Sequence, residues 1–124
     1  AAIITHEGKY LIAQRPPDGH LPGKWEFVGG KVKPGETAEQ CVVREVEEEI
    51  GVEIRLWSEF QVIDHPYTDR RVKVHFFNCH LNGPPPDPVV YPHTRWVALD
   101  ELPFYDFAEA TRPVVQALFT TLEL

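Results

Sequence analysis

The segment from residue 29 to residue 52 constrains this chain more than any other part of it. It reads GGKVKPGETAEQCVVREVEEEIGV. From Gly30 onward it follows the pattern G-x5-E-x7-R-E-U-x-E-E-x-G-U, where U is a bulky aliphatic residue and where Glu36 and Arg44 fill the first acidic and basic positions. With ordinary residue frequencies, such a match arises by chance in a chain of this length with a probability of about 10⁻⁸. The pattern is therefore specific.

The spacing of this segment predicts a helix over Ala38–Ile50. Thr37 is a suitable N-cap, because its hydroxyl can accept a hydrogen bond from the first turn. Gly51 stands where a helix stop is expected. An apolar stripe for burial runs along one side of the helix and consists of Ala38, Val42, Val46 and Ile50.

Three acidic residues share the face beside this stripe. Glu45, Glu48 and Glu49 lie together because successive helical residues advance by about 100°. Like charges one turn apart repel by roughly 0.2–0.5 kcal/mol per pair, which a bound cation would offset. All the candidate ligands are oxygen atoms, and this favours Mg²⁺ or Mn²⁺ over zinc. The alternative is a solvated acidic face with Arg44 paired to Glu48, and the glutamates alone do not decide between the two.

The loop before the helix favours the metal interpretation. Glu36 and the glycine pair Gly29-Gly30 occur at fixed distances from the helical acids. This loop can bring Gly30 and Lys31 back toward the carboxylates. The glycine pair taken alone is equally compatible with a plain turn.

Length and composition predict one domain over residues 1–124, with 43% hydrophobic residues available for a core. The net charge of −7 excludes a basic surface for duplex nucleic acid. Cys41 and Cys79 indicate reduced, buried thiols of a cytoplasmic protein rather than a disulfide. No apolar run reaches the roughly 18 residues of a membrane helix, so no membrane partner is expected.

Apolar periodicity predicts several short strands around the central helix and a second helix near the end of the chain. The expected strands are residues 1–5, 10–14, 25–28, 52–63, 71–80 and 95–99, and the second helix is 111–122. This order of elements predicts an α+β or α/β sandwich. Residue 1 is not methionine and falls inside an expected strand, so we expect a few residues to precede it.

The pattern around Glu36 and Arg44 fills every position of the Nudix box, so the chain resembles the Nudix hydrolases. Flanking residues resemble the subgroup of MutT-type nucleoside triphosphate pyrophosphohydrolases; they are Gly8-Lys9-Tyr10-Leu11-Ile12, Gln14-Arg15, Lys24-Trp25-Glu26-Phe27, Trp96 and Arg112-Pro113-Val114. The resemblance implies an α/β/α sandwich around a mixed sheet. It also implies hydrolysis of a nucleoside diphosphate linked to another group.

The resemblance assigns roles to the residues of the box. It implies that Glu45, Glu48, Glu49 and the Gly30 carbonyl hold the catalytic Mg²⁺, with Mn²⁺ as a substitute. Glu36 and Arg44 would orient these ligands. Glu45 is the first candidate for the general base and Glu48 the second.

Other residues are candidates for binding the nucleotide. An acidic protein needs local positive charge to bind a phosphate ester, and Arg15 and Lys31 would supply it beside the metal. Arg15 could equally pair with Asp18 alone. The full candidate set for substrate binding is Arg15, Trp25, Phe27, Lys31 and Thr111.

Two positions depart from the subgroup. Its members often carry an acid in the loop before the last strand, but residues 88–95 offer only Tyr91, His93 and Thr94. Members that bind oxidised guanine have an asparagine at the position where this chain has Thr111. One hydroxyl group cannot reproduce the pair of hydrogen bonds that an asparagine amide makes with a base. This weakens the case for 8-oxo-dGTP without removing it.

The expected function is Mg²⁺-dependent hydrolysis of a nucleoside triphosphate, such as an oxidised purine nucleotide, to nucleoside monophosphate and pyrophosphate. One alternative keeps the enzyme and changes the substrate to CTP and other pyrimidine nucleotides, nucleotide sugars or dinucleoside polyphosphates. Another is a module that binds a nucleotide without turning it over. The partner is a small molecule in each case, and the sequence leaves a monomer or a dimer open.

Overall fold

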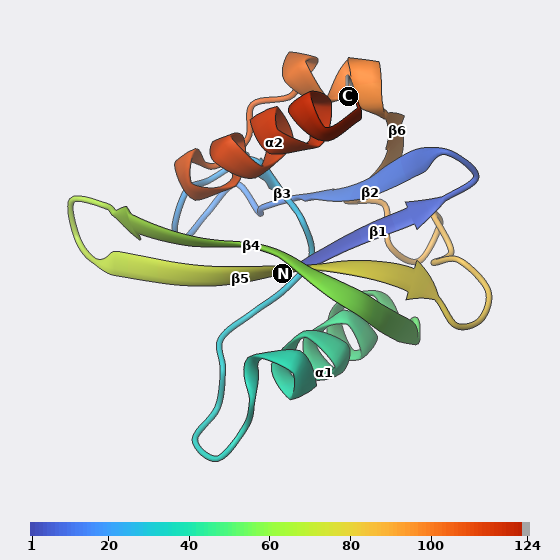
Figure 1. Ribbon diagram of the computed structural model, residues 1–124, viewed down its shortest axis with the longest axis horizontal. Helices are drawn as coiled ribbons and strands as arrows, with labels where there is room; N and C mark the ends of the chain where they lie inside the picture. Colours follow the sequence, from blue (N-terminus) through green and yellow to red (C-terminus); the bar gives the residue numbers. More distant parts are fainter. Residues whose placement is uncertain (123–124) are drawn as a thin grey trace.

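The computed structural model describes residues 1–122 of the chain (Figure 1). The strands are β1 (Ala2–His6), β2 (Lys9–Gln14), β3 (Trp25–Glu26), β4 (Ile54–Pro66), β5 (Arg71–Leu81) and β6 (Thr94–Ala98). The helices are α1 (Ala38–Ile50) and α2 (Arg112–Leu122), with short 3-10 helices η1 (Leu99–Phe104) and η2 (Glu109–Thr111).

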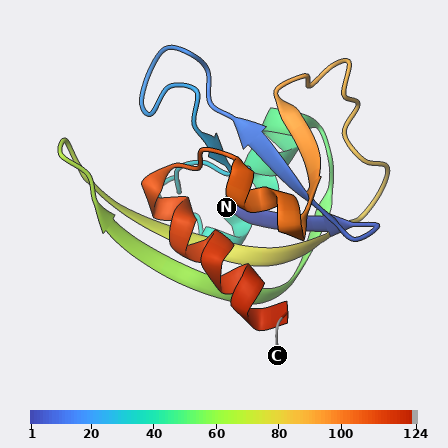
Figure 2. The same cartoon turned by 90° about the horizontal axis from the view of Figure 1, so that it is seen from above.

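The strands form one mixed sheet between two helical layers. Their order is β3-β2-β1-β5-β4, and β6 also pairs with β2. β1 runs parallel to β5, while the other strand pairs are antiparallel. α1 covers one face of the sheet and α2 covers the other, and both views show the β4–β5 hairpin extending to one side (Figures 1 and 2). This arrangement confirms the expected α/β/α sandwich.

Two hydrophobic clusters fill the two layers. On β1, Ile4 belongs to the cluster under α1 and Ile3 to the cluster under α2. Leu11 and Ile12 on β2 divide in the same way. The division follows from the two-residue period of a strand, in which neighbouring side chains point to opposite faces. The nearly continuous apolar runs of β1 and β2 therefore reflect a sheet that is covered on both faces.

α1 begins and ends where local sequence signals place it. The Thr37 Oγ1 atom accepts a hydrogen bond from the Gln40 backbone N–H at 3.1 Å, and Gln40 Oε1 accepts one from the Thr37 N–H at 3.0 Å. Gly51 adopts the left-handed conformation with φ of 67° and donates its N–H to the Glu47 carbonyl. Both predicted caps are confirmed. The helix buries Cys41, Val42, Val46 and Ile50.

Replacing Thr37 with alanine is expected to lower the free energy of unfolding by about 1 kcal/mol, because the cap loses its side-chain acceptor. Chemical denaturation of the variant would measure this change. Thr120→Ala is the matched control, since Thr120 lies on exposed helix surface and its hydroxyl donates only to the Gln116 carbonyl. Equal stability of the two variants would contradict the role of the cap.

The structure corrects several expected boundaries. β4 extends to Pro66, beyond the expected end at residue 63, because its antiparallel register with β5 continues to Arg71. The second helix begins at Arg112, because Thr111 still belongs to η2 and donates its N–H to the Ala108 carbonyl three residues back. η1 was not expected from the sequence. Within residues 1–122, no helix is long and apolar enough to cross a membrane.

Candidate functional site

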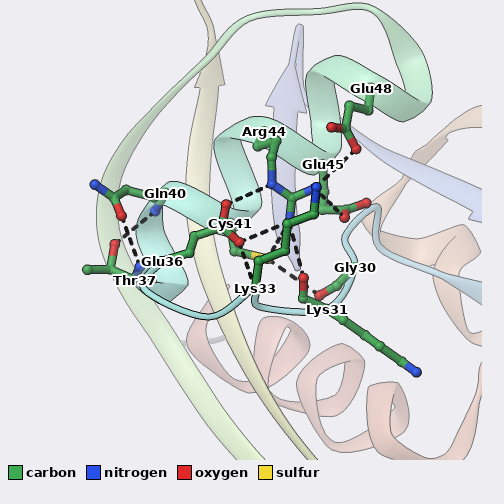
Figure 3. Close-up of polar contacts among 10 residues, drawn as sticks. All are labelled: Gly30, Lys31, Lys33, Glu36, Thr37, Gln40, Cys41, Arg44, Glu45 and Glu48. Carbon is green, nitrogen blue, oxygen red and sulfur yellow. Dashed lines mark hydrogen bonds and ion pairs between the residues drawn. The ribbon is translucent and has the colours of Figure 1, made fainter.

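The Arg44 guanidinium connects the loop before α1 to the acids of the helix (Figure 3). Its Nε and Nη2 donate to the two carboxylate oxygens of Glu36 at 2.7 and 2.9 Å. Nη1 donates to Glu45 Oε1 at 2.7 Å and to Glu48 Oε2 at 3.1 Å. Nη2 also donates to the Lys31 carbonyl at 3.1 Å. The resemblance implied that Glu36 and Arg44 would orient the helical glutamates. Arg44 contacts Glu45 and Glu48 directly, whereas Glu36 contacts Arg44.

The loop is shaped so that Glu36 meets this arginine. Gly35 takes a φ of 79°, and the turn lets the Glu36 carboxylate accept a hydrogen bond from the Lys33 backbone N–H at 3.0 Å. The hydrogen bonds from Arg44, and then that from Lys33, hold the pKa of Glu36 down to about 2. Contact with Glu36 and Glu45 raises the pKa of Arg44. The pair is therefore charged throughout the physiological range.

Gly30 lies directly against the Glu45 carboxylate. A Cβ atom added at Gly30 would stand 2.2 Å from the Glu45 carboxyl carbon and 2.3 Å from its Oε2. Only a glycine permits this approach. The Glu45 side chain is 15% exposed. Cys41 Sγ donates to the Gly30 carbonyl at 3.6 Å from the helix side. Two of the expected metal ligands are thus neighbours.

A further acid, Glu26, joins this group. Desolvation of the Glu49 carboxylate, followed by the negative charges of Glu45 and Glu26, raises the pKa of Glu49 to about 7. Glu26 also accepts a hydrogen bond from Arg15 Nη1 at 2.9 Å, so the partner of Arg15 is Glu26 rather than Asp18. The sequence did not identify Glu26 as a site residue. Its only signal was its place between Trp25 and Phe27, just before the glycine turn.

The donor atoms at this site suit a hard divalent cation. They are carboxylate and carbonyl oxygens. The pKa of Glu49 is raised first by desolvation and then by repulsion from Glu45 and Glu26, and a cation beside these acids would offset the repulsion. Among residues 1–122, no three His, Cys, Asp or Glu side chains are grouped tightly enough to hold one ion. Instead the Arg44 guanidinium contacts both Glu45 and Glu48. Their carboxylates must therefore turn from Arg44 to share a cation.

A cavity of about 640 Å³, here called the central cavity, lies beside Gly30, but Glu45, Glu48 and Glu49 are not among the residues that line it. Four of the five residues predicted to bind the nucleotide line it, together with Glu26, Gly30, His20 and Tyr67; the four are Arg15, Phe27, Lys31 and Thr111. Phe27 is buried and packs against Phe76 and Phe107. The fifth predicted residue, Trp25, is not in the lining. Its ring packs against Tyr105 at 5.2 Å and under the Arg95 guanidinium at 5.4 Å.

A second, more open groove of about 830 Å³ follows the outer side of α1. It reaches Arg44 and Glu48 but neither Gly30 nor Lys31. A larger volume does not make it the better candidate, because the central cavity alone combines the glycine turn with cationic and aromatic walls.

The loop before β6 packs against the C-terminal end of α1. The Tyr91 hydroxyl packs against Gly51, where an added Cβ would lie 2.6 Å from it. The His93 carbonyl accepts a hydrogen bond from the Gln14 N–H at 2.9 Å. Within the described residues, neither side chain forms a hydrogen bond or an ion pair with Glu45 or Glu48.

Comparison with known proteins places these features in a family. The family model for the NUDIX domain matches residues 1–117. An 8-oxo-dGTP diphosphatase of Escherichia coli K12 is 36% identical over 118 residues, covering 94% of this chain and 91% of the relative. A CTP pyrophosphohydrolase of the same organism is 34% identical over 119 residues, covering 94% and 87%. The crystal structure of a MutT NUDIX hydrolase from Burkholderia pseudomallei superposes with a TM-score of 0.79 at 30% identity, covering 93% of this chain and 92% of that one.

Proposed function

The chain belongs to the NUDIX domain family, and on that premise we propose that it hydrolyses nucleoside triphosphates to nucleoside monophosphate and pyrophosphate in the cytoplasm. The observation that carries the proposal is the contact of Gly30 with the Glu45 carboxylate at the edge of the central cavity. It sets oxygen donors beside a space that has cationic and aromatic walls. Such a space suits a molecule that has phosphates at one end and a flat base at the other.

Nudix hydrolases generally need a divalent metal, and we assign Mg²⁺ here, with Mn²⁺ as a substitute. Glu45, Glu48, Glu49 and the Gly30 carbonyl would hold it. When bound, the cation neutralises phosphate charge and lowers the pKa of water in its coordination sphere. Arg44, itself held by Glu36, fixes the Glu45 and Glu48 carboxylates through contacts of 2.7 and 3.1 Å.

Other side chains of the site bind the phosphates and accept the proton from water. Arg15 and Lys31 bind phosphate oxygens, and Arg15 is held toward the site by Glu26. Water attacks an inner phosphorus, the bond from that phosphorus to the leaving pyrophosphate oxygen breaks, and a carboxylate oxygen of Glu45 takes the proton from the water. Glu48 is the second candidate for this base, because its side chain is 55% exposed and open to water.

The relatives favour two substrate classes, oxidised purine nucleotides and CTP. Thr111 bears on the choice because it is 5% exposed and lines the cavity. Its hydroxyl can rotate and either donate or accept a hydrogen bond at a base edge, which suits tolerance of several bases better than strict selection. Purine triphosphates remain the first candidate and pyrimidine triphosphates the second.

The test is a nucleotide panel with Mg²⁺ in which both products are identified. It contains 8-oxo-dGTP, dGTP, CTP, a nucleotide sugar and a dinucleoside tetraphosphate. Monophosphate and pyrophosphate are expected from at least one triphosphate. Glu48→Gln should lower the rate about tenfold or more, whereas Glu47→Gln should not, because Glu47 is exposed on the same helix. Orthophosphate or sugar phosphate as the main product, or no turnover of any substrate, would contradict the proposal.

A further inference from the structure

Trp25 connects two segments that form part of the wall of the central cavity. Glu26 and Phe27 line the cavity and directly follow Trp25 in the chain. Ala108 and Thr111 also line it, and they come from the segment that leads into α2. Trp25 itself is not one of the described residues that line the cavity. Its position is that of a support for the wall rather than of a contact to the ligand.

The backbone of Trp25 is hydrogen-bonded to this second segment at two points. Its N–H donates to the Asp106 carbonyl at 2.9 Å, and its carbonyl accepts from the Ala108 N–H at 3.0 Å. Through these bonds Trp25 forms an isolated parallel bridge with Phe107. The Thr111 N–H donates to the Ala108 carbonyl at 2.9 Å, so the turn that carries Thr111 starts from a residue that Trp25 holds.

The side chain of Trp25 is held in a cluster with two other residues, here called the Trp25 clamp. The Trp25 ring packs edge-on against Tyr105, with 5.2 Å between centroids and 78° between planes. The Arg95 guanidinium lies 5.4 Å from the Trp25 centroid and 5.8 Å from the Tyr105 centroid. Arg95 Nη1 also donates to the Tyr105 hydroxyl at 3.3 Å. Edge-on rings and a cation over a ring are both favourable arrangements, so the clamp favours one position of Tyr105 relative to β3.

The clamp reaches the cavity through Phe107, which is buried. The Phe107 ring stacks against that of Phe27 with 6.1 Å between centroids, and Phe27 lines the cavity. The Phe107 N–H donates to the Tyr105 carbonyl at 3.1 Å. A shift of Tyr105 would therefore be passed to Phe107 and from there to both parts of the wall.

We propose that Trp25 is a positioning residue for substrate binding, which fixes the segment 108–111 against Phe27 so that the cavity is preformed for the base of the nucleotide. The inference rests on the proposed function, because it takes the ligand of the cavity to be a nucleotide. A wall that is already ordered costs less free energy to complete when the ligand enters. Phosphate binding is left to Arg15 and Lys31, so the clamp acts on the nucleoside end of the substrate.

Equilibrium binding of 8-oxo-dGMP, dGMP and CMP, measured beside steady-state kinetics, tests the proposal. Trp25→Leu is expected to weaken binding of the preferred monophosphate by about three- to tenfold, the scale of one lost aromatic pair. KM for the triphosphate should rise by a similar factor while kcat stays near the wild-type value, because the lost support serves ground state and transition state equally. Binding of inorganic tripolyphosphate should stay unchanged. Trp25→Phe should recover most of the affinity, because it keeps a ring against Tyr105.

Two further variants separate the clamp from a general loss of an aromatic side chain. Trp57→Leu is the matched control, since Trp57 also packs on a neighbouring ring, that of His80 at 5.7 Å, but lies on β4 away from the cavity lining. It should bind as the wild type does. Tyr105→Leu should reproduce the effect of Trp25→Leu, and the double variant should lose little more, because both changes remove the same contact. Tyr105→Leu also provides the test if Trp25→Leu does not fold.

Equal monophosphate binding by Trp25→Leu and the wild type would overturn the proposal. It would also be overturned by a matching loss of tripolyphosphate binding, by a fall in kcat at unchanged KM, or by additive losses in the double variant. Monophosphate binding that depends on Trp25, in a protein that hydrolyses no triphosphate, would uphold this inference and refute the proposed function. Triphosphate turnover with normal KM in Trp25→Leu would refute this inference alone.

Discussion

Replacing Gly30 with alanine is expected to lower kcat/KM by about 100-fold or more while the midpoint of thermal unfolding changes little. The added Cβ would meet the Glu45 carboxylate at 2.2–2.7 Å. The obstructing atoms are the end of a flexible side chain, so the carboxylate can swing away at small cost to the fold. It would then leave the place where we expect it to bind the cation, and losing a ligand costs more than the 10- to 100-fold typical of a supporting contact.

A double-mutant cycle separates this cause from general damage to the loop. In a Glu45→Gln background the carboxylate is already gone, so adding Gly30→Ala should cost little further activity. Steady-state kinetics and thermal melts of the four proteins would measure both quantities. Additive losses in the cycle would show that alanine acts through the backbone, and the assignment of Glu45 beside Gly30 would fail.

Replacing Arg44 with methionine is expected to lower kcat/KM by about 10- to 100-fold and to lower stability as well. Methionine fills similar space but cannot donate hydrogen bonds, so Glu36, Glu45 and Glu48 would lose their shared partner. Arg44→Lys should rescue little of the activity, because one ammonium group cannot contact both oxygens of Glu36 and still reach Glu45.

The matched control is Arg55→Met on β4. Arg55 is exposed and has no ion pair among the described residues, so its loss should leave both kinetics and stability near the wild-type values. Kinetics at saturating Mg²⁺ and urea denaturation would measure the two effects. An Arg44→Met variant that kept wild-type kcat/KM would show that the helical glutamates need no orienting partner.

The sequence was sufficient to predict α1 and its loop, because the signals there are local. Thr37, Gly51 and the spacing of Glu36 from Arg44 act within a few residues of the structure they determine. The ends of β4 were predicted less well. Its length depends on the register with β5 and on two irregularities in that pairing, which depend on tertiary contacts rather than on nearby residues.

Residues at the site that depend on tertiary packing were also harder to identify. Arg15 pairs with Glu26 rather than Asp18 because the antiparallel pairing of β2 with β3 brings them together. Trp25 and Phe27 were equivalent candidates in the sequence, but only one of them lines the central cavity. Phe27 is one of the residues that line the cavity, whereas the ring of Trp25 packs with that of Tyr105.

The parallel pairing of β1 with β5 has a consequence for how this protein folds. Ala2 is in register with Phe77, so the centre of the sheet forms only after a loop of about 75 residues has closed. For a flexible chain, closing a loop of that length costs roughly 4 kcal/mol of entropy. Both hydrophobic layers include residues of β1. Docking of the first strand should therefore be a late and cooperative step, and a partly folded chain that lacks it should be unable to assemble the nucleotide site.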